Sequence, residues 1–192
     1  AHLTVTADNQ SRLYGQANPS LTQTISGFVN NENLASSGVS GTALGSTSAT
    51  ATTNVGSAAI VASTSGLSAG NYDFTASSTD GTLTIDKAHL TVTADNKTRL
   101  YGQANPTLTT TVSGFVNGES ASTAAGFAGA GTASTTAVAA TNVGTATITA
   151  GAGTLAATNY DFANLTDGTL TIDKAHLTVT ADNQSRLYGQ AN

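Results

Sequence analysis

The sequence predicts a mainly β protein made of tandem small β domains arranged as an elongated rod. Two observations predict this class. The strand-favouring residues Thr, Val and Ile number 52 of 192, and the chain repeats itself with a period of 87 residues. A unit of this length can hold a small core, and it exceeds a usual solenoid rung of about 20–45 residues. We therefore expect separate domains joined end to end.

Three nearly identical segments reveal the repeat. Residues 1–18 and 175–192 are identical, and residues 88–105 differ from them at two positions. The expected domains are a first repeat at residues 1–87 and a second at residues 88–174. Residues 175–192 are then the first strand and turn of a truncated third repeat. Because one strand is not a stable domain, we expect the chain to be a window on a longer array.

The first half of a repeat is expected to contain two strands and a loop. Leu3, Val5 and Ala7 alternate with polar residues, which predicts a half-buried strand that ends in a turn at Asp8-Asn9. A second strand is expected at residues 21–28. Residues 30–35, and 118–125 in the second repeat, contain enough Ala to permit one or two helical turns.

The second half is expected to supply three strands. One covers residues 56–62, and the next contains Tyr72 and Phe74, which share a face because they are two residues apart. Asp80-Gly81 predicts a hairpin that pairs this strand with residues 82–86. The residues expected to be buried together are Tyr72, Phe74, Leu83, Ile85, Leu3, Val5 and Phe28. Their equivalents are Tyr160, Phe162, Leu170, Ile172, Leu90, Val92 and Phe115.

At the border between the repeats, the apolar positions change from odd-numbered to even-numbered residues. Leu83 and Ile85 have odd numbers, whereas the apolar Leu90 and Val92 have even numbers. One continuous strand cannot bury both pairs on one side, so strand structure should break or twist at residues 87–89. No Gly, Ser or Pro lies there, and we expect consecutive domains to be held stiffly.

Several blocks occur in the same order in both repeats: LTVTAD, RLYGQANP, SGFVN, NVG, NYDF and DGTLTIDKA. This combination resembles the MBG-type tandem domain with a Tyr-Gly motif, which is found in large bacterial surface adhesins. The resemblance implies a modified β-grasp-like domain, with an Ig-like sandwich as the alternative, repeated along an extracellular stalk. The residues that match the motif are Tyr14, Gly15, Tyr101, Gly102, Tyr188 and Gly189.

Composition and motifs point away from catalysis. Six Lys and Arg residues cannot form a basic stripe, which argues against nucleic acid, and no apolar run has the length of a membrane span. The three histidines, His2, His89 and His176, occupy one repeat position, which is unlike an active site. We assign no catalytic, cofactor-binding or metal-binding residue and expect no enzyme. Calcium at the junctions is a weak alternative, for which the candidate ligands are Asp86, Asp95, Asp173 and Asp182.

Two functions remain after these exclusions. The first is a structural stalk or spacer of an extracellular bacterial adhesin or surface fibre, which holds an adhesive region away from the cell. The second is a module that binds matrix carbohydrate or self-assembles into a filament. Tyr14, Tyr101 and Tyr188 could stack on sugars, but packing of each over its own turn, with the hydroxyl bonded to backbone, is favoured. The expected partners are neighbouring repeats of the same chain or, alternatively, identical chains in a fibre.

Overall fold

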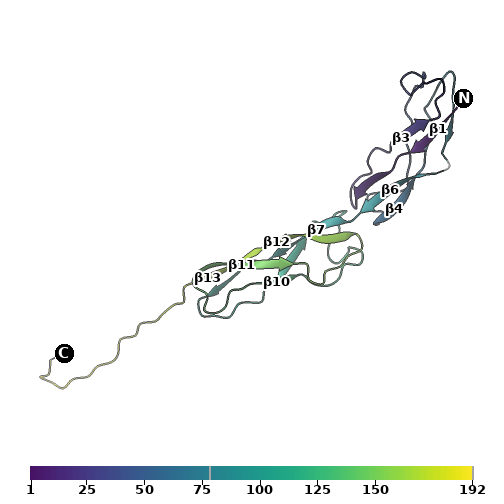
Figure 1. Ribbon diagram of the computed structural model, residues 1–192. Helices are drawn as coiled ribbons and strands as arrows, with labels where there is room; N and C mark the ends of the chain where they lie inside the picture. The colour runs from purple at the N-terminus through teal and green to yellow at the C-terminus, as the bar shows by residue number, and fades with distance from the viewer. Residues whose placement is uncertain (78, 192) are drawn as a thin grey trace.

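The computed structural model describes residues 1–77 and 79–191, which form strands and loops without a helix. Figure 1 shows two β units that follow one another along an elongated molecule, from which the C-terminal segment extends. We name residues 1–87 the first repeat and residues 88–174 the second repeat, after the sequence period. The expected mainly β class is confirmed as two tandem β domains, each made of small mixed sheets.

Each repeat contains two sheets, and a central strand in each sheet has one parallel and one antiparallel neighbour. In the first repeat, β1 (His2–Ala7) lies between antiparallel β3 (Gln23–Ser26) and parallel β5 (Asp73–Ala76). The second sheet places β6 (Gly81–Asp86) between parallel β2 (Gln10–Leu13) and antiparallel β4 (Gly56–Ile60).

The second repeat has the same topology with one additional strand. In its first sheet, β7 (Ala88–Ala94) lies between antiparallel β9 (Thr110–Ser113) and parallel β12 (Tyr160–Thr166). In its second sheet, β13 (Gly168–Asp173) lies between parallel β8 (Lys97–Leu100) and antiparallel β11 (Gly144–Gly151). The short strand β10 (Thr132–Ser134) adds to the edge at β11.

The prediction of a hairpin at Asp80-Gly81 is wrong. The strands on either side of it, β5 and β6, belong to different sheets, and β5 pairs with β1 instead. A Cβ atom at Gly81 would lie 2.6 Å from the carbonyl oxygen of Ala7. The glycine therefore allows two backbone segments to approach closely where the chain crosses between sheets, and it does not form a hairpin turn.

The optional helical turns do not develop into helices. In the first repeat, the Ser37 amide donates to the Asn33 carbonyl at 2.9 Å, and the Asn33 side chain accepts from the amides of Ala35 and Ser36. This is the beginning of a helix, with a capping residue, that is not continued. The second repeat has the matching single turn, in which the Ala124 amide donates to the Ser120 carbonyl.

The core is thin and divided between the sheets. Leu3, Val5, Leu83, Ile85 and Tyr72 are buried as predicted, and so are their equivalents Leu90, Val92, Leu170, Ile172 and Tyr160. The expected phenylalanines, Phe28 and Phe74 in the first repeat and Phe115 and Phe162 in the second, are only half-buried. The seven residues do not form one cluster, because Leu83 and Ile85 pack in a cluster that continues to Leu90 and Tyr160 of the second repeat. The first repeat thus completes part of its core with its neighbour.

The predicted break at residues 87–89 is confirmed. Strand β6 ends at Asp86 and β7 begins at Ala88, so Lys87 alone separates them. The chain leaves the middle of one sheet and enters the middle of another at this residue. That change of sheet explains how residues of opposite parity are buried on both sides of the junction.

Residues 175–191 form no strand, although their sequence repeats that of β1 and β2. Leu177 and Val179, which correspond to the buried Leu3 and Val5, are 91% and 96% exposed. None of the described residues belongs to a helix with the length and apolar character needed to cross a membrane.

A buried arginine fixes the loop that follows the second strand of each repeat. Arg12 is 6% exposed, and its guanidinium donates to the Asn18 side chain at 2.8 Å and to the carbonyls of Leu13 and Thr50. Asn18 in turn donates to the Ala49 carbonyl at 2.7 Å. All three of these acceptors are neutral oxygens, and the rigid fork of donors in the guanidinium fixes the backbone geometry around them.

The second repeat reproduces this arrangement. Arg99 donates to Asn105, to the Leu100 carbonyl and to the Val138 carbonyl, and Asn105 donates to the Ala137 carbonyl. In both repeats the arginine ties its own loop to the segment that precedes the Asn-Val-Gly block. This contact was not anticipated from the sequence, in which Arg12 lies in a polar stretch.

Arg99→Lys tests this role. A lysine ammonium cannot reproduce the planar fork and leaves buried carbonyls without donors, so we expect a loss of about 2–4 kcal/mol in the free energy of unfolding. Chemical denaturation measures the loss. Arg186→Lys, at the same repeat position in the exposed C-terminal segment, is the control and should change nothing. An equal effect of both substitutions would contradict the structural role of Arg99.

Candidate functional site at the junction of the repeats

The Tyr-Gly loop of the first repeat lies at the junction. The loop starts after β2, where the Tyr14 amide donates to the Asp86 carbonyl at 2.8 Å and so holds the loop beside the end of β6. Gly15 has a φ of +82° and donates its amide to the Ala51 carbonyl. A residue with a Cβ is strained at this φ, which explains the glycine. Tyr14 projects from the loop and is only 3% exposed.

The surface that receives Tyr14 belongs to the second repeat. It is centred on Tyr160, the first residue of β12, which is fully buried. The Tyr160 hydroxyl donates to Glu119 Oε2 at 2.5 Å, and the Val116 amide donates to the same hydroxyl at 3.2 Å. Phe115 packs edge-on against Tyr160, with ring centroids 5.5 Å apart. The receiving surface therefore consists of the aromatic rings of Phe115 and Tyr160 with the Glu119 carboxylate beside them.

A shared carboxylate connects the two repeats. The Tyr14 hydroxyl donates to Glu119 Oε1 at 2.7 Å, while Glu119 Oε2 accepts from Tyr160. The two tyrosine rings meet edge to face, with centroids 5.6 Å apart and planes at 81°. This geometry is favourable for aromatic pairs, and each hydrogen bond to a carboxylate is stronger than one between neutral groups.

A buried amide forms the second contact across the junction. Asn159 is 1% exposed, and its side chain accepts from the Val55 amide at 3.1 Å and donates to Asn54 Oδ1 at 2.9 Å. Both partners belong to the Asn-Val-Gly block of the first repeat. The Asn159 carbonyl also accepts from the Ala88 amide at 3.0 Å, which connects the contact to the start of β7.

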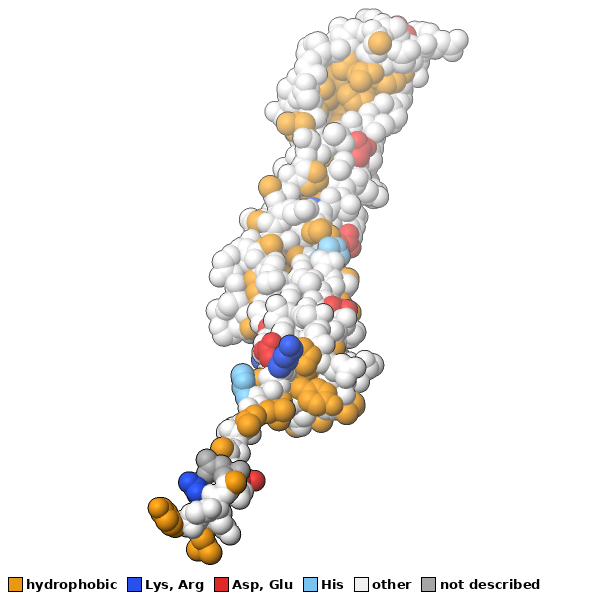
Figure 2. All heavy atoms as spheres, turned by 90° about the vertical axis from the view of Figure 1, so that its left-hand side faces the viewer, with side chains coloured by type: hydrophobic (Ala, Val, Ile, Leu, Met, Phe, Trp, Pro, Cys, Tyr) orange, Lys and Arg blue, Asp and Glu red, His pale blue; other side chains and the backbone are white. Residues whose placement is uncertain are grey.

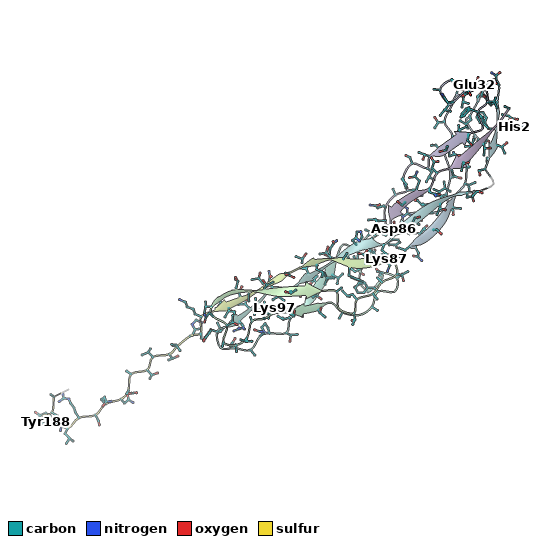
Figure 3. All side chains as sticks on the ribbon, viewed as in Figure 1. His2, Glu32, Asp86, Lys87, Lys97 and Tyr188 are labelled. Carbon is teal, nitrogen blue, oxygen red and sulfur yellow. The ribbon has the colours of Figure 1, made fainter. Side chains whose placement is uncertain are left out.

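Smaller contacts surround these groups. Asn117 donates its side-chain amide to the Ala51 carbonyl at 3.3 Å, and Lys87 donates to the Ala157 carbonyl at 3.0 Å. A Cβ atom at Gly15 would lie 2.3 Å from Val116 Cγ2, so the absence of a side chain at Gly15 makes room for Val116. Figure 3 places Asp86 and Lys87 between the two units.

The environment of the junction favours the neutral form of the Tyr14 and Tyr160 hydroxyls. Burial, followed by the hydrogen bond to Glu119, raises the pKa of Tyr160 to about 12. The same two causes raise the pKa of Tyr14 above its ordinary value. Both hydroxyls therefore remain protonated donors at neutral pH, as the shared carboxylate requires.

The residues of the junction can be compared with their repeat equivalents at the outer ends of the two repeats. Tyr101 and Val143, the equivalents of Tyr14 and Val55, are 44% and 48% exposed at the far end of the second repeat. At the N-terminal end of the first repeat, away from the junction, Tyr72 and Glu32 correspond to Tyr160 and Glu119. These two residues are also hydrogen-bonded to each other, at 2.5 Å. Contact with the neighbouring repeat thus accounts for the burial of Tyr14.

Tyr14 does not pack over its own turn with its hydroxyl on backbone, as the sequence suggested, because the hydroxyl reaches Glu119 of the other repeat. Glu119, Asn159 and Arg12 were not identified as site residues. Each has a repeat equivalent, in Glu32, Asn71 and Arg99, and this recurrence is the signal that could have identified them.

The other candidate residues lie apart from this contact. His2 and His89 are exposed and pair with Asp73 and Asp161, at 2.5 and 2.8 Å. In the described ranges, no three His, Cys, Asp or Glu side chains lie close enough to hold a metal ion. The carboxylate of Asp95 accepts instead from Thr109 and Thr111, and these hydrogen bonds lower its pKa. Figure 2 shows one face of the molecule, on which charged side chains are few.

We expect the stability of the junction to fall at high pH. Because the folded-state pKa of Tyr160 is raised from 10.0 to about 12, its contribution is complete below pH 10 and is lost as the pH rises through about 12. Urea denaturation at a series of pH values measures this loss. Tyr160→Phe keeps the ring without a titrating hydroxyl and should flatten the decline. An unchanged decline in this variant would contradict the assignment.

Comparison with known proteins agrees with the internal repeat. The family model described as MBG domain (YGX type) matches residues 3–84 and, a second time, residues 90–171. No curated protein and no solved structure matches the chain. MBG repeats are typical of bacterial surface proteins and are generally non-catalytic modules. The two matches cover most of the chain, which therefore belongs to the MBG domain family of YGX type.

Proposed function

We propose that these MBG domains are structural spacer repeats of an extracellular bacterial adhesin or surface fibre, in which they hold an adhesive region away from the cell. The domain borders in this proposal lie at Lys87–Ala88 and Lys174–Ala175. The observation that supports it is the buried contact in which Tyr14 and Tyr160 share the Glu119 carboxylate. A spacer needs consecutive domains that keep a constant orientation, and this contact opposes bending.

The connection between the domains supports the same function. Only Lys87 separates β6 from β7, and the Asn159 amide bonds to Asn54 and Val55 beside the tyrosine contact. A connection of one residue with packed side chains on both sides has little freedom to rotate. Each added repeat then extends the rod by a constant step.

Distance measurements between spin labels test this stiffness. The chain has no cysteine, so Ser57→Cys and Thr145→Cys, both exposed and one repeat apart, provide two specific labelling sites. Pulsed electron paramagnetic resonance should give one narrow distance distribution. Gly15→Ala should broaden it, because the new methyl group collides with Val116.

Gly102→Ala is the matched control for that experiment. Its φ of +83° imposes the same backbone strain, but a Cβ atom there meets no atom within 4 Å. The control should therefore keep the narrow distribution. A broad distribution in the unsubstituted chain would reject the spacer proposal.

Deletion of residues 88–174 separates a spacer from a binding module. The deletion joins Lys87 to Ala175 and so restores the Lys-Ala sequence of the original junction. Small-angle scattering should show a molecule that is shorter by one repeat, with no change in binding on a glycan array. A loss of glycan affinity on removal of this repeat would instead indicate a multivalent carbohydrate-binding module.

A further inference from the structure

The turn between Val116 and Glu119 contains the one Asn-Gly pair of the sequence, Asn117-Gly118. Both residues have positive φ angles, of +54° and +71°, and both are exposed. The Glu119 amide closes the turn by donating to the Val116 carbonyl at 2.9 Å. Asparagine and glycine adopt this conformation more readily than other residues, so the pair suits the turn. It also brings two groups that can react with each other to the surface.

The backbone nitrogen of Gly118 is accessible to the side chain that precedes it. In the part of the chain that the structure describes, the Gly118 amide donates to no protein acceptor. A Cβ atom at this position would meet no atom within 4 Å, so the space around the turn is open. Glycine also has no side chain to hinder the approach of its own nitrogen to the Asn117 carboxamide. This nitrogen and the carboxamide carbon, Cγ, can therefore close a succinimide ring.

The same turn is part of the contact between the repeats. Asn117 donates its side-chain amide to the Ala51 carbonyl at 3.3 Å, a distance longer than that of a typical hydrogen bond. Val116 faces the Tyr-Gly loop of the first repeat, and Glu119 accepts from the Tyr14 hydroxyl. A chemical change at Asn117 therefore acts directly on the junction.

We propose that Asn117 is a site of spontaneous deamidation and that the carboxylate formed there loosens the contact between the two repeats. In the first step, the Gly118 nitrogen gives its proton to hydroxide and attacks Asn117 Cγ. The new N–Cγ bond replaces the bond from Cγ to Nδ2, and Nδ2 leaves as ammonia after taking a proton from water. Water then opens the succinimide by adding to either of its carbonyl carbons. The net reaction consumes one water and releases one ammonia, with no oxidation or reduction.

The two directions of ring opening give different products. Hydrolysis at Cγ leaves an ordinary aspartate in place of Asn117. Hydrolysis at the backbone carbonyl leaves isoaspartate, in which the main chain runs through Cβ and Cγ. The isoaspartate lengthens the backbone by one carbon between Val116 and Glu119, so the hydrogen bond that closes the turn cannot keep its geometry.

Either product weakens the junction. A carboxylate accepts hydrogen bonds and does not donate them, so the Ala51 carbonyl loses its donor and faces a negative charge instead. The new charge also lies two residues from Glu119, whose carboxylate accepts from Tyr14 and Tyr160. Like charges repel, and the repulsion increases where water is partly excluded. The stiffness of the junction should therefore decline as the protein ages.

The first repeat lacks this reactive pair. Its equivalent turn contains Asn30-Asn31, with φ angles of +54° and +57°. The side chain of Asn31 stands beside the attacking nitrogen and should slow ring closure. Because the two turns have nearly the same backbone conformation, their sequences can be exchanged without new strain.

Peptide mass spectrometry of the aged protein tests the chemistry. The purified chain is kept in water enriched in heavy oxygen, in neutral and in mildly alkaline buffer. Fragment spectra should show loss of the amide and uptake of the labelled oxygen at Asn117, at a rate that rises with hydroxide concentration. Gly118→Asn should slow this conversion at least several-fold. Conversion at Asn117 that is no faster than at Asn30 would overturn the proposal.

Spin-label distances test the effect on the junction. The chain labelled at Ser57→Cys and Thr145→Cys should begin with a narrow distribution that broadens in step with conversion of Asn117. Asn117→Asp in the same labelled chain should broaden the distribution before any incubation. A distribution that stays narrow after complete conversion would reject the loosening.

An exchange of the two turns provides the matched control. The double variant Asn31→Gly/Gly118→Asn has the same composition as the unsubstituted chain, but its Asn-Gly pair lies in the first repeat, away from the junction. It should deamidate at Asn30 and keep its narrow distance distribution. Equal broadening in this variant would show that deamidation does not act through the junction and would overturn the proposal.

The loosening rests on the stiff junction of the proposed spacer function, and the two can fail separately. A broad distribution in the fresh chain rejects the spacer, while the labelled-oxygen measurement still decides whether Asn117 deamidates. A narrow distribution in a chain whose Asn117 does not convert keeps the spacer and rejects the deamidation site.

Discussion

The junction depends on the buried guanidinium of Arg12. By donating to Asn18 and to the carbonyls of Leu13 and Thr50, it joins the Tyr-Gly loop to the segment before the Asn-Val-Gly block. The loop supplies Tyr14, and the block that follows the second segment supplies Asn54; the two residues reach the second repeat from separate parts of the chain. The Gly15 amide and the Asn18 side chain add hydrogen bonds to Ala51 and Ala49 of the same segment, so the two halves of the contact surface keep one relative position.

Glu119 is the one charged side chain in the tyrosine contact between the two repeats. One carboxylate accepts from two phenols, and both hydroxyls are neutral donors, so no cation has to be buried beside it. Glu119 is half-buried, and removing a charge even partly from water is costly, so the hydrogen bonds from both tyrosines offset much of that cost. Only 9% of the residues are charged, and contacts between the domains accordingly rest on hydroxyls, amides and aromatic edges.

Most of the strands, the repeat and the break near Lys87 could be predicted from the sequence, because the alternation of apolar and polar residues is a local property of the chain. The pairing of strands could not. Asp80-Gly81 has the composition of a hairpin turn, but β5 finds its partner in β1 and the chain crosses to another sheet. Strand β2 was missed because its single buried side chain is Arg12, which breaks the apolar pattern. The partner of Tyr14 lies 105 residues away, beyond the reach of any local pattern.

The position of the first and last strands of each repeat determines how the molecule responds to tension. Strands β1 and β6, and likewise β7 and β13, are each an interior strand of a sheet and are paired on both sides. Ladder hydrogen bonds run across the strands, so a pull along the chain shears two ladders at once and cannot peel one edge open bond by bond. A mechanical load that enters at one terminus is thereby shared among many bonds in every domain before any domain extends.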